Sequence, residues 1–193
     1  MIFRIKKDSH IYRDSHIRST LSKKNFVLVG LMGAGKTTVG SIMSSIIKIP
    51  FVDVDHEIEK LSSMSIEDFF NYHGEDAFRD LELRVTKFFL QGTNRIIALG
   101  GGGFINDEIR EYILEKGITL WLQANFDILW NRINNSLDKR PLLNLSDPKE
   151  TLRKLMESRN SIYAKADMVL VSSDLSIEET VDNAISKLAD YNF

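Results

Sequence analysis

The stretch that decides the fold is residues 26–38, Phe-Val-Leu-Val-Gly-Leu-Met-Gly-Ala-Gly-Lys-Thr-Thr. Within it, residues 30–37 match the pattern G-x-x-x-x-G-K-[ST] and are termed the phosphate loop below. The apolar run at 26–29 predicts a buried parallel strand, and the residues after Gly35 predict a helix over 36–47. A strand directly before the loop and a helix directly after it form the context in which this pattern binds a nucleoside triphosphate.

The residue types of the phosphate loop each suit a phosphate ligand. Its glycines allow a positive φ, so that backbone N–H groups converge on phosphate oxygens, and the helix N-terminus favours an anion. Lys36 places a positive charge between the β- and γ-phosphates, and the Thr37 hydroxyl is a hard oxygen ligand for Mg²⁺. The residues predicted to contact the nucleotide are Gly33, Ala34, Gly35, Lys36, Thr37 and Thr38.

Strand and helix patterns alternate along the rest of the chain. Short apolar runs predict further strands over residues 51–53, 95–99, 119–122 and 168–171. Amphipathic or capped segments predict helices over residues 56–62, 66–71, 75–90, 107–115, 125–133, 150–163 and 177–190. This alternation predicts an α/β fold, in which helices cover both faces of a five-stranded parallel sheet in three αβα layers.

Length and composition restrict the possible classes of protein. The chain has 193 residues, 43% hydrophobic and 27% charged, which predicts one domain with one core. A net charge of -2 does not favour nucleic acid or an anionic membrane as a partner. The absence of cysteine excludes disulfides, Cys-ligated metals and a thiol nucleophile, and is compatible with a reducing, cytoplasmic location. No apolar run approaches the roughly 20 residues that span a bilayer.

The first 24 residues differ from the rest in charge. They contain seven Lys and Arg residues against two Asp residues, and no apolar stretch of the kind a signal peptide needs. We expect residues 1–24 to be a flexible, solvated extension and residues 25–193 to form the single domain. The alternative is a basic arm that binds an anion or a partner.

Two carboxylates end the second predicted strand as Asp53-x-Asp55. The carboxyl ends of parallel strands border the ligand crevice of an open sheet, so both side chains should face the phosphate loop. One carboxylate suits Mg²⁺, and the other suits a substrate hydroxyl as acceptor or general base. The alternative is a pair of surface carboxylates that stabilise a helix N-terminus.

Further candidates lie in the predicted helix 75–90 and directly after the third strand. Arg79 and Glu82 share one helix face, so Glu82 can hold Arg79 toward an anionic substrate group. The alternative is an exposed ion pair worth about 0.3–0.5 kcal/mol. The glycine run that starts at Gly100 and continues through Gly101 and Gly102 allows the backbone to approach a ligand closely.

The polar segment 134–149 contains two of the three prolines and has no clear period, so we predict a loop that acts as an active-site lid. Arg140 would swing over the γ-phosphate and stabilise developing charge. Arg132, just upstream, either stacks on adenine or is a solvated helix residue, and Arg159 lies in the helix after the lid.

Together these motifs resemble the shikimate kinase family from about residue 25 to the C-terminus. The shared features are the phosphate loop, Asp53-x-Asp55, Phe78-Arg79-x-x-Glu82, the glycine run, Arg140-Pro-Leu-Leu, and Arg159 four residues before Tyr163. The chain departs from the family at Ser161-Ile162, where Pro-Leu is usual, but the spacing from Arg159 to Tyr163 is kept. The resemblance implies a P-loop kinase fold with a lid, like that of nucleoside monophosphate kinases, and strand order 2-3-1-4-5.

The resemblance also implies an activity and a role for each candidate. The chain would transfer the γ-phosphate of ATP to the 3-hydroxyl of shikimate, as a monomer with small-molecule partners, Mg²⁺ as metal, and no nucleic acid or membrane. Lys36, Asp55 and Arg140 would be catalytic, and Arg132 would join the nucleotide site. The implied metal ligands are Thr37 and Asp53, and the implied shikimate site consists of Asp55, Arg79, Gly100, Gly101, Gly102 and Arg159. The alternatives are another small-molecule kinase, such as a gluconate kinase, or a kinase-like binding protein without activity.

Overall fold

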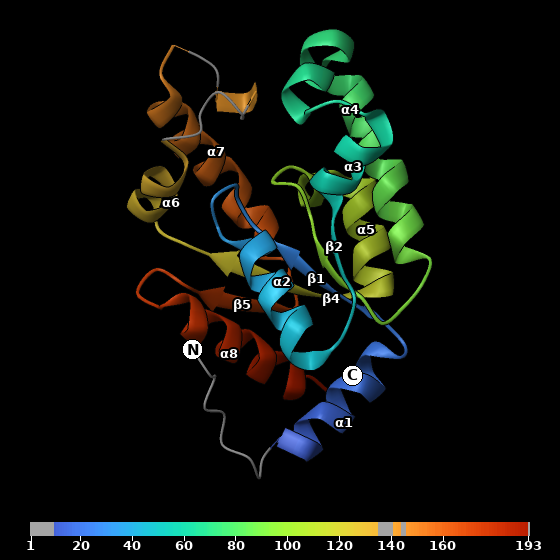
Figure 1. Ribbon diagram of the computed structural model, residues 1–193. Helices are drawn as coiled ribbons and strands as arrows, with labels where there is room; N and C mark the ends of the chain where they lie inside the picture. The colour runs from blue at the N-terminus through green and yellow to red at the C-terminus, as the bar shows by residue number, and fades with distance from the viewer. Residues whose placement is uncertain (1–9, 135–140, 144–145, 193) are drawn as a thin grey trace.

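The computed structural model describes residues 10–134, 141–143 and 146–192 (Figure 1). One parallel sheet lies at its centre, formed by β1 (Asn25–Val29), β2 (Phe51–Asp53), β3 (Ile96–Ala98), β4 (Gly117–Gln123) and β5 (Met168–Val171). The strand order is β2-β3-β1-β4-β5, so the predicted five-stranded sheet and its order are confirmed. β1 lies in the middle and pairs with β3 and β4, with Phe26 opposite Ile96 on one side and Ile118 on the other.

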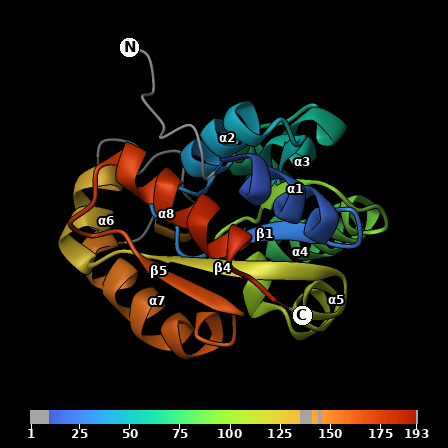
Figure 2. The same ribbon diagram turned by 90° about the horizontal axis from the view of Figure 1, so that it is seen from below.

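The helices cover both faces of this sheet. They are α2 (Lys36–Ile47), α3 (Val54–Ser62), α4 (Ile66–Leu90), α5 (Asp107–Lys116), α6 (Phe126–Ile133), α7 (Pro148–Tyr163) and α8 (Ile177–Ala189). Figure 2 shows α2 and α8 on one face and α5 and α7 on the other, which gives the predicted three layers. Every residue of β1 is buried, as expected for a strand covered on both faces. Among the described residues, no helix has both the length and the apolar character to cross a bilayer.

Local signals in the sequence explain where several helices begin. Asn125 accepts a hydrogen bond from the backbone N–H of Ile128 and so caps α6. Ser176 and Glu179 form a reciprocal capping box at the start of α8, as the sequence predicts. These caps fix where the loops after β4 and β5 end and where α6 and α8 begin.

The two helices predicted over 66–71 and 75–90 form one element, α4, which is broken by a kink at Gly74. Gly74 has φ 79° and ψ 173°, a conformation that essentially only glycine adopts. The two arms of α4 contact each other through aromatic rings, since the ring centroids of Phe70 and Phe78 lie 4.6 Å apart. The kink thus brings Phe70 of the first arm against Phe78 of the second arm.

Part of the expected flexible extension is instead a packed helix, α1 (His10–Leu21). Ile17 and Leu21 are 1% and 0% exposed and belong to the core, and Arg18 donates a hydrogen bond to the carbonyl of Ile47 at the end of α2. Residues 1–9 lie outside the described residues. The expectation of a flexible extension was based on the charge of this segment. Ile17 and Leu21 lie one helical turn apart on one face of the helix, and their burial makes the helix pack against the domain.

Replacing Leu21 with alanine is expected to lower the free energy of unfolding by about 2–5 kcal/mol, because it removes a fully buried side chain. For a chain of this size each kcal/mol corresponds to about 2–4 °C in melting temperature. Thermal melting followed by circular dichroism measures the effect. Ser19→Ala, an exposed position on the same helix, is the control and should leave melting unchanged. Equal melting of the two variants would contradict the packing of α1.

Candidate active site

The phosphate loop lines a cavity of about 530 Å³ at the carboxyl ends of the strands. All six residues predicted to contact the nucleotide line this cavity: Gly33, Ala34, Gly35, Lys36, Thr37 and Thr38. Gly33 and Gly35 have φ values of 78° and 96°, the positive φ that the motif needs. The Lys36 ammonium donates hydrogen bonds to the carbonyls of Gly30 at 2.8 Å and Leu31 at 3.0 Å, so the loop curls around the lysine.

Thr37 and Asp53 meet at the floor of this cavity. The Thr37 hydroxyl donates to Asp53 Oδ2 at 2.6 Å, and Asp53 Oδ1 accepts from the backbone N–H of His56 at the start of α3. A hydroxyl and a carboxylate are hard oxygen donors, which fit Mg²⁺. Within the described parts of the chain, no three His, Cys, Asp or Glu residues gather as a metal site. The donor set therefore suits a magnesium ion that takes its other ligands from phosphates and water.

A smaller cavity of about 90 Å³ adjoins the first. Charged residues Asp55, Arg79 and Glu82 line it together with Gly101 and Gly102, whereas the predicted Gly100 is not among its lining residues. Its apolar wall consists of Met32, Ile66, Phe70, Phe78 and Leu142. Asp55 and Gly101 line both cavities, which makes the two spaces neighbours. One cavity with a phosphate loop thus opens beside a second with an arginine, carboxylates and an apolar wall.

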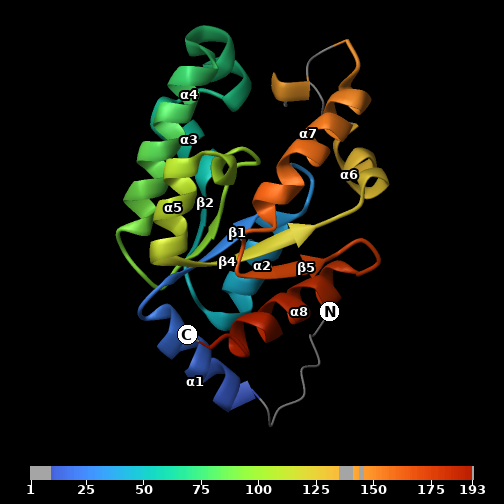
Figure 3. The same cartoon turned by 180° about the vertical axis from the view of Figure 1, so that it is seen from behind.

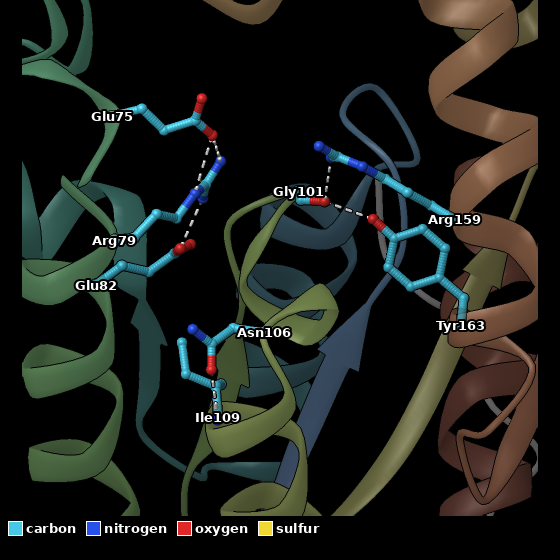
Figure 4. Close-up of polar contacts among 8 residues, drawn as sticks. All are labelled: Glu75, Arg79, Glu82, Gly101, Asn106, Ile109, Arg159 and Tyr163. Carbon is cyan, nitrogen blue, oxygen red and sulfur yellow. Dashed lines mark hydrogen bonds and ion pairs between the residues drawn. The ribbon is translucent and has the colours of Figure 1, made fainter.

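Arg79 is held by two carboxylates of its own helix (Figure 4). Its Nη1 donates to Glu82 Oε2 at 2.7 Å and its Nη2 donates to Glu75 Oε1 at 3.0 Å. The Glu82 side chain is only 1% exposed, and this burial raises the pKa of Glu82, which Arg79 partly offsets. The exposed-pair alternative for Arg79 and Glu82 is therefore wrong, because the carboxylate is buried.

Asp55 lies between the two cavities. Burial raises the pKa of Asp55 to about 7, with further increases from the nearby carboxylates of Glu82 and Asp53, while Lys36 and Arg79 oppose the shift. A carboxyl group with a pKa near neutrality is suited to exchange a proton at physiological pH. The alternative of two plain surface carboxylates does not describe Asp55, which is partly buried and lies among charged groups.

The glycine run leaves room for the charged side chains packed against it. A Cβ atom on Gly100 would lie 2.4 Å from Asp55 Oδ1 and 2.7 Å from Glu82 Oε1. A Cβ atom on Gly102 would lie 2.5 Å from Arg79 Nη1. The sequence predicts that these glycines admit a ligand to the backbone. The structure adds that they make room for the acidic and basic side chains of the smaller cavity.

Arg159 approaches the same point from the opposite side. Figures 1 and 3 show α4 and α7 rising on opposite sides of the molecule, and Figure 4 shows Arg79 and Arg159 on either side of Gly101. Arg159 Nη1 donates to the carbonyl of Gly101 at 2.9 Å. The two arginines that are far apart in the sequence are thus both directed at the glycine run.

Arg132 also lines the larger cavity, and its Nη1 donates to the carbonyl of Gly33 at 3.1 Å. Its side chain is exposed, so its contact with adenine stays a prediction. Four residues that the sequence did not single out also line this cavity: Ser172, Leu175, Ile177 and Thr180. They follow β5, and their position at the carboxyl end of a strand is the signal that could have found them. Arg140 lies outside the described residues, whereas Leu142 in the 3₁₀ turn η3 (Pro141–Leu143) lines the smaller cavity.

Comparison with known proteins gives a consistent result. The family model described as shikimate kinase matches residues 32–189. A shikimate kinase from Rhizobium leguminosarum bv. trifolii is 47% identical over 171 residues, which is 89% of this chain and 87% of that protein.

Solved structures agree with this match. A shikimate kinase from Acinetobacter baumannii in complex with shikimate superposes with a TM-score of 0.84 and 28% identity, covering 89% of this chain and 96% of that chain. A gluconokinase from Sinorhizobium meliloti has a TM-score of 0.55 and 17% identity, covering 87% of this chain and 93% of that chain, so it shares the fold alone. With the family model spanning most of its length and a relative at 47% identity, the chain belongs to the shikimate kinase family.

Proposed function

We propose that the chain transfers the γ-phosphate of ATP to the 3-hydroxyl of shikimate, giving shikimate 3-phosphate and ADP. The observation that carries this proposal is the adjacency of the two cavities, which share Asp55 and Gly101. Phosphoryl transfer depends mainly on bringing acceptor and donor together and on compensating charge. A triphosphate in one cavity and a ring acid in the other meet beside Asp55.

The nucleotide is held by the phosphate loop. Its backbone N–H groups bind phosphate oxygens, and the Lys36 ammonium compensates the charge that develops on the γ-phosphate. Thr37 and Asp53, which bond to each other, would hold Mg²⁺, and the ion would neutralise phosphate charge. Arg132, Leu175 and Ile177 also line this cavity and would contact the base.

Shikimate is held by groups of opposite character in the smaller cavity. The guanidinium of Arg79, which lines this cavity, and that of Arg159, which lies on the carbonyl of Gly101 beside it, would bind the ring carboxylate through charge-assisted hydrogen bonds. Asp55 accepts a hydrogen bond from the ring hydroxyls and takes the proton of the attacking one. Phe70 and Phe78 cover the apolar side of the ring, which excludes water that would otherwise hydrolyse ATP. Arg140, beyond the described residues, remains the predicted lid arginine.

A coupled assay of ADP release by the purified protein tests this function. We expect ADP to form with ATP, Mg²⁺ and shikimate, little ADP without shikimate, and a product with the mass of shikimate 3-phosphate. Gluconate is the discriminating alternative acceptor. Turnover of gluconate without turnover of shikimate would contradict the proposed substrate, and binding of both ligands without ADP release would indicate a silent binding protein.

Replacing Gly102 with alanine is expected to raise KM for shikimate about tenfold, a loss of about 1.4 kcal/mol. The added methyl group would displace the Arg79 guanidinium, while KM for ATP should change less than about twofold. Gly92→Ala is a matched control, since its Cβ would lie 2.2 Å from Arg95 Nη1, a guanidinium that lines neither of the two cavities. Similar steady-state constants for the two variants would argue against an Arg79 role in shikimate binding.

We also propose that the protein acts as a monomer in the cytoplasm. Residues of one chain line both cavities, so the chemistry described above requires no second copy. The lack of cysteine is compatible with a reducing compartment.

A further inference from the structure

Tyr163 has no part in the function proposed so far, although it points at the site. It is the last residue of α7, only 1% exposed, and lies one helical turn after Arg159. Side chains four residues apart project from the same face of a helix. Tyr163 and Arg159 therefore approach the glycine run together, as Figure 4 shows.

Both side chains donate to one acceptor. The Tyr163 hydroxyl donates to the carbonyl of Gly101 at 2.5 Å, and Arg159 Nη1 donates to the same oxygen at 2.9 Å. A carbonyl oxygen has two lone pairs, so it can accept both bonds at once. The glycine carbonyl thus links the hydroxyl of a buried tyrosine to the guanidinium of Arg159, which has a long flexible stem.

The tyrosine ring is fixed on two sides. It stacks on Phe104 with a centroid distance of 6.5 Å and an interplanar angle of 10°, and it packs against Trp121 at 5.9 Å. Burial raises the pKa of Tyr163 to about 12, so the hydroxyl keeps its proton and remains a donor at any pH the enzyme meets. A rigid, permanently protonated donor is suited to fix the carbonyl of a glycine in place.

Gly101 provides the carbonyl that Tyr163 and Arg159 bond. It lies among four consecutive glycines, which have more backbone freedom than other residues, and it lines both cavities. Its position is also close to the phosphate loop, because a Cβ atom on Gly101 would lie 3.2 Å from the backbone nitrogen of Met32. A shift of this glycine would therefore move the anchor of Arg159 and the boundary between the two pockets.

We infer that Tyr163 is a positioning residue for the acceptor acid: its hydroxyl fixes the Gly101 carbonyl, and through that oxygen it orients the guanidinium of Arg159 toward the carboxylate of the acceptor. The inference rests on the proposed role of Arg159 in shikimate binding. Tyr163 is not among the residues that line either cavity, since its hydroxyl donates to the backbone and its ring packs against Phe104 and Trp121.

The variant Tyr163→Phe removes the hydroxyl and keeps the ring. We expect KM for shikimate to rise about three- to tenfold, the range that corresponds to the loss of one hydrogen bond, with KM for ATP unchanged within about twofold. Tyr191→Phe, near the C-terminus, is the matched control and should leave both constants unchanged. A marked fall in the melting temperature of Tyr163→Phe without a change in KM for shikimate would assign Tyr163 a structural role alone and overturn the inference.

A double-mutant cycle separates this inference from the proposed function. Because Tyr163 acts through Arg159, adding Tyr163→Phe to an Arg159→Ala protein should raise KM for shikimate no further. If the two effects instead multiply, the tyrosine acts independently of the arginine and the inference is wrong, although the function stands. If Arg159→Ala alone leaves KM for shikimate unchanged, the proposed role of Arg159 fails first.

Discussion

Replacing Lys36 with alanine should lower kcat by about a thousandfold, the order of magnitude seen when one preorganised group that stabilises transition-state charge is removed. The Lys36 side chain is only 8% exposed, and its ammonium is enclosed by the carbonyls of Gly30 and Leu31 at the mouth of the phosphate loop. Among the residues that the structure describes, no other lysine lines either cavity, so no second ammonium replaces the lost one. ADP release with shikimate present measures the effect.

A matched lysine distinguishes lost catalysis from general damage. Lys60→Ala removes a lysine whose side chain is 58% exposed and whose ion pair with Glu57 lies on the surface of α3. An exposed pair of this kind contributes at most about 1 kcal/mol, so activity and melting should stay close to those of the unmodified protein. Circular dichroism establishes whether Lys36→Ala is folded. A folded Lys36→Ala protein with unreduced kcat would refute the assignment of the phosphate loop.

The second large effect is expected at Arg79. Arg79→Ala should raise KM for shikimate about a hundredfold, because a charge-assisted bond to the carboxylate is lost in a partly enclosed site. KM for ATP should change little, since Arg79 does not line the larger cavity. Stability should fall as well, because the buried Glu82 carboxylate loses its partner, and breaking a buried pair costs about 3–5 kcal/mol.

Two further variants separate these consequences of removing Arg79. Arg84→Ala, on the same helix, removes an exposed pair with Asp80 and should alter neither shikimate binding nor melting. In Arg79→Ala combined with Glu82→Gln, the buried charge is gone, so melting should recover while KM for shikimate stays high. Recovery of both properties would mean that Arg79 only neutralises Glu82, and equal effects of Arg79→Ala on both substrates would indicate a general structural role.

The order of elements could be predicted because its signals are local. The apolar run of β1 and the phosphate loop lie within 13 consecutive residues, and β5 spans the predicted residues Met168–Val171. Parallel strands joined by helices cross over with one hand, which leaves few arrangements for such a chain. The position of Asp53 and Asp55 at the end of a predicted strand likewise suffices to place them at the ligand edge of the sheet.

Other features depend on contacts between distant parts of the chain. The helix α1 packs because Ile17 and Leu21 find a surface formed partly by α8, more than 150 residues later in the chain. The wall of the larger cavity includes Leu175 and Ile177, which have no motif of their own. Burial of Glu82, which changes an ordinary helix ion pair into part of a site, also follows from packing and not from the spacing of the pair.

The sheet, the phosphate loop and the family could therefore be predicted from the residues alone, because periodicity, turn chemistry and a short glycine-rich motif act over short distances. The contacts of Gly101 with Arg159, Tyr163 and the phosphate loop, and of Gly102 with Arg79, arise only when the chain has folded. Tyr163 and Gly101 are 62 residues apart, and a bond over such a separation forms only once burial of the whole core has compensated the entropy of ordering the chain between them.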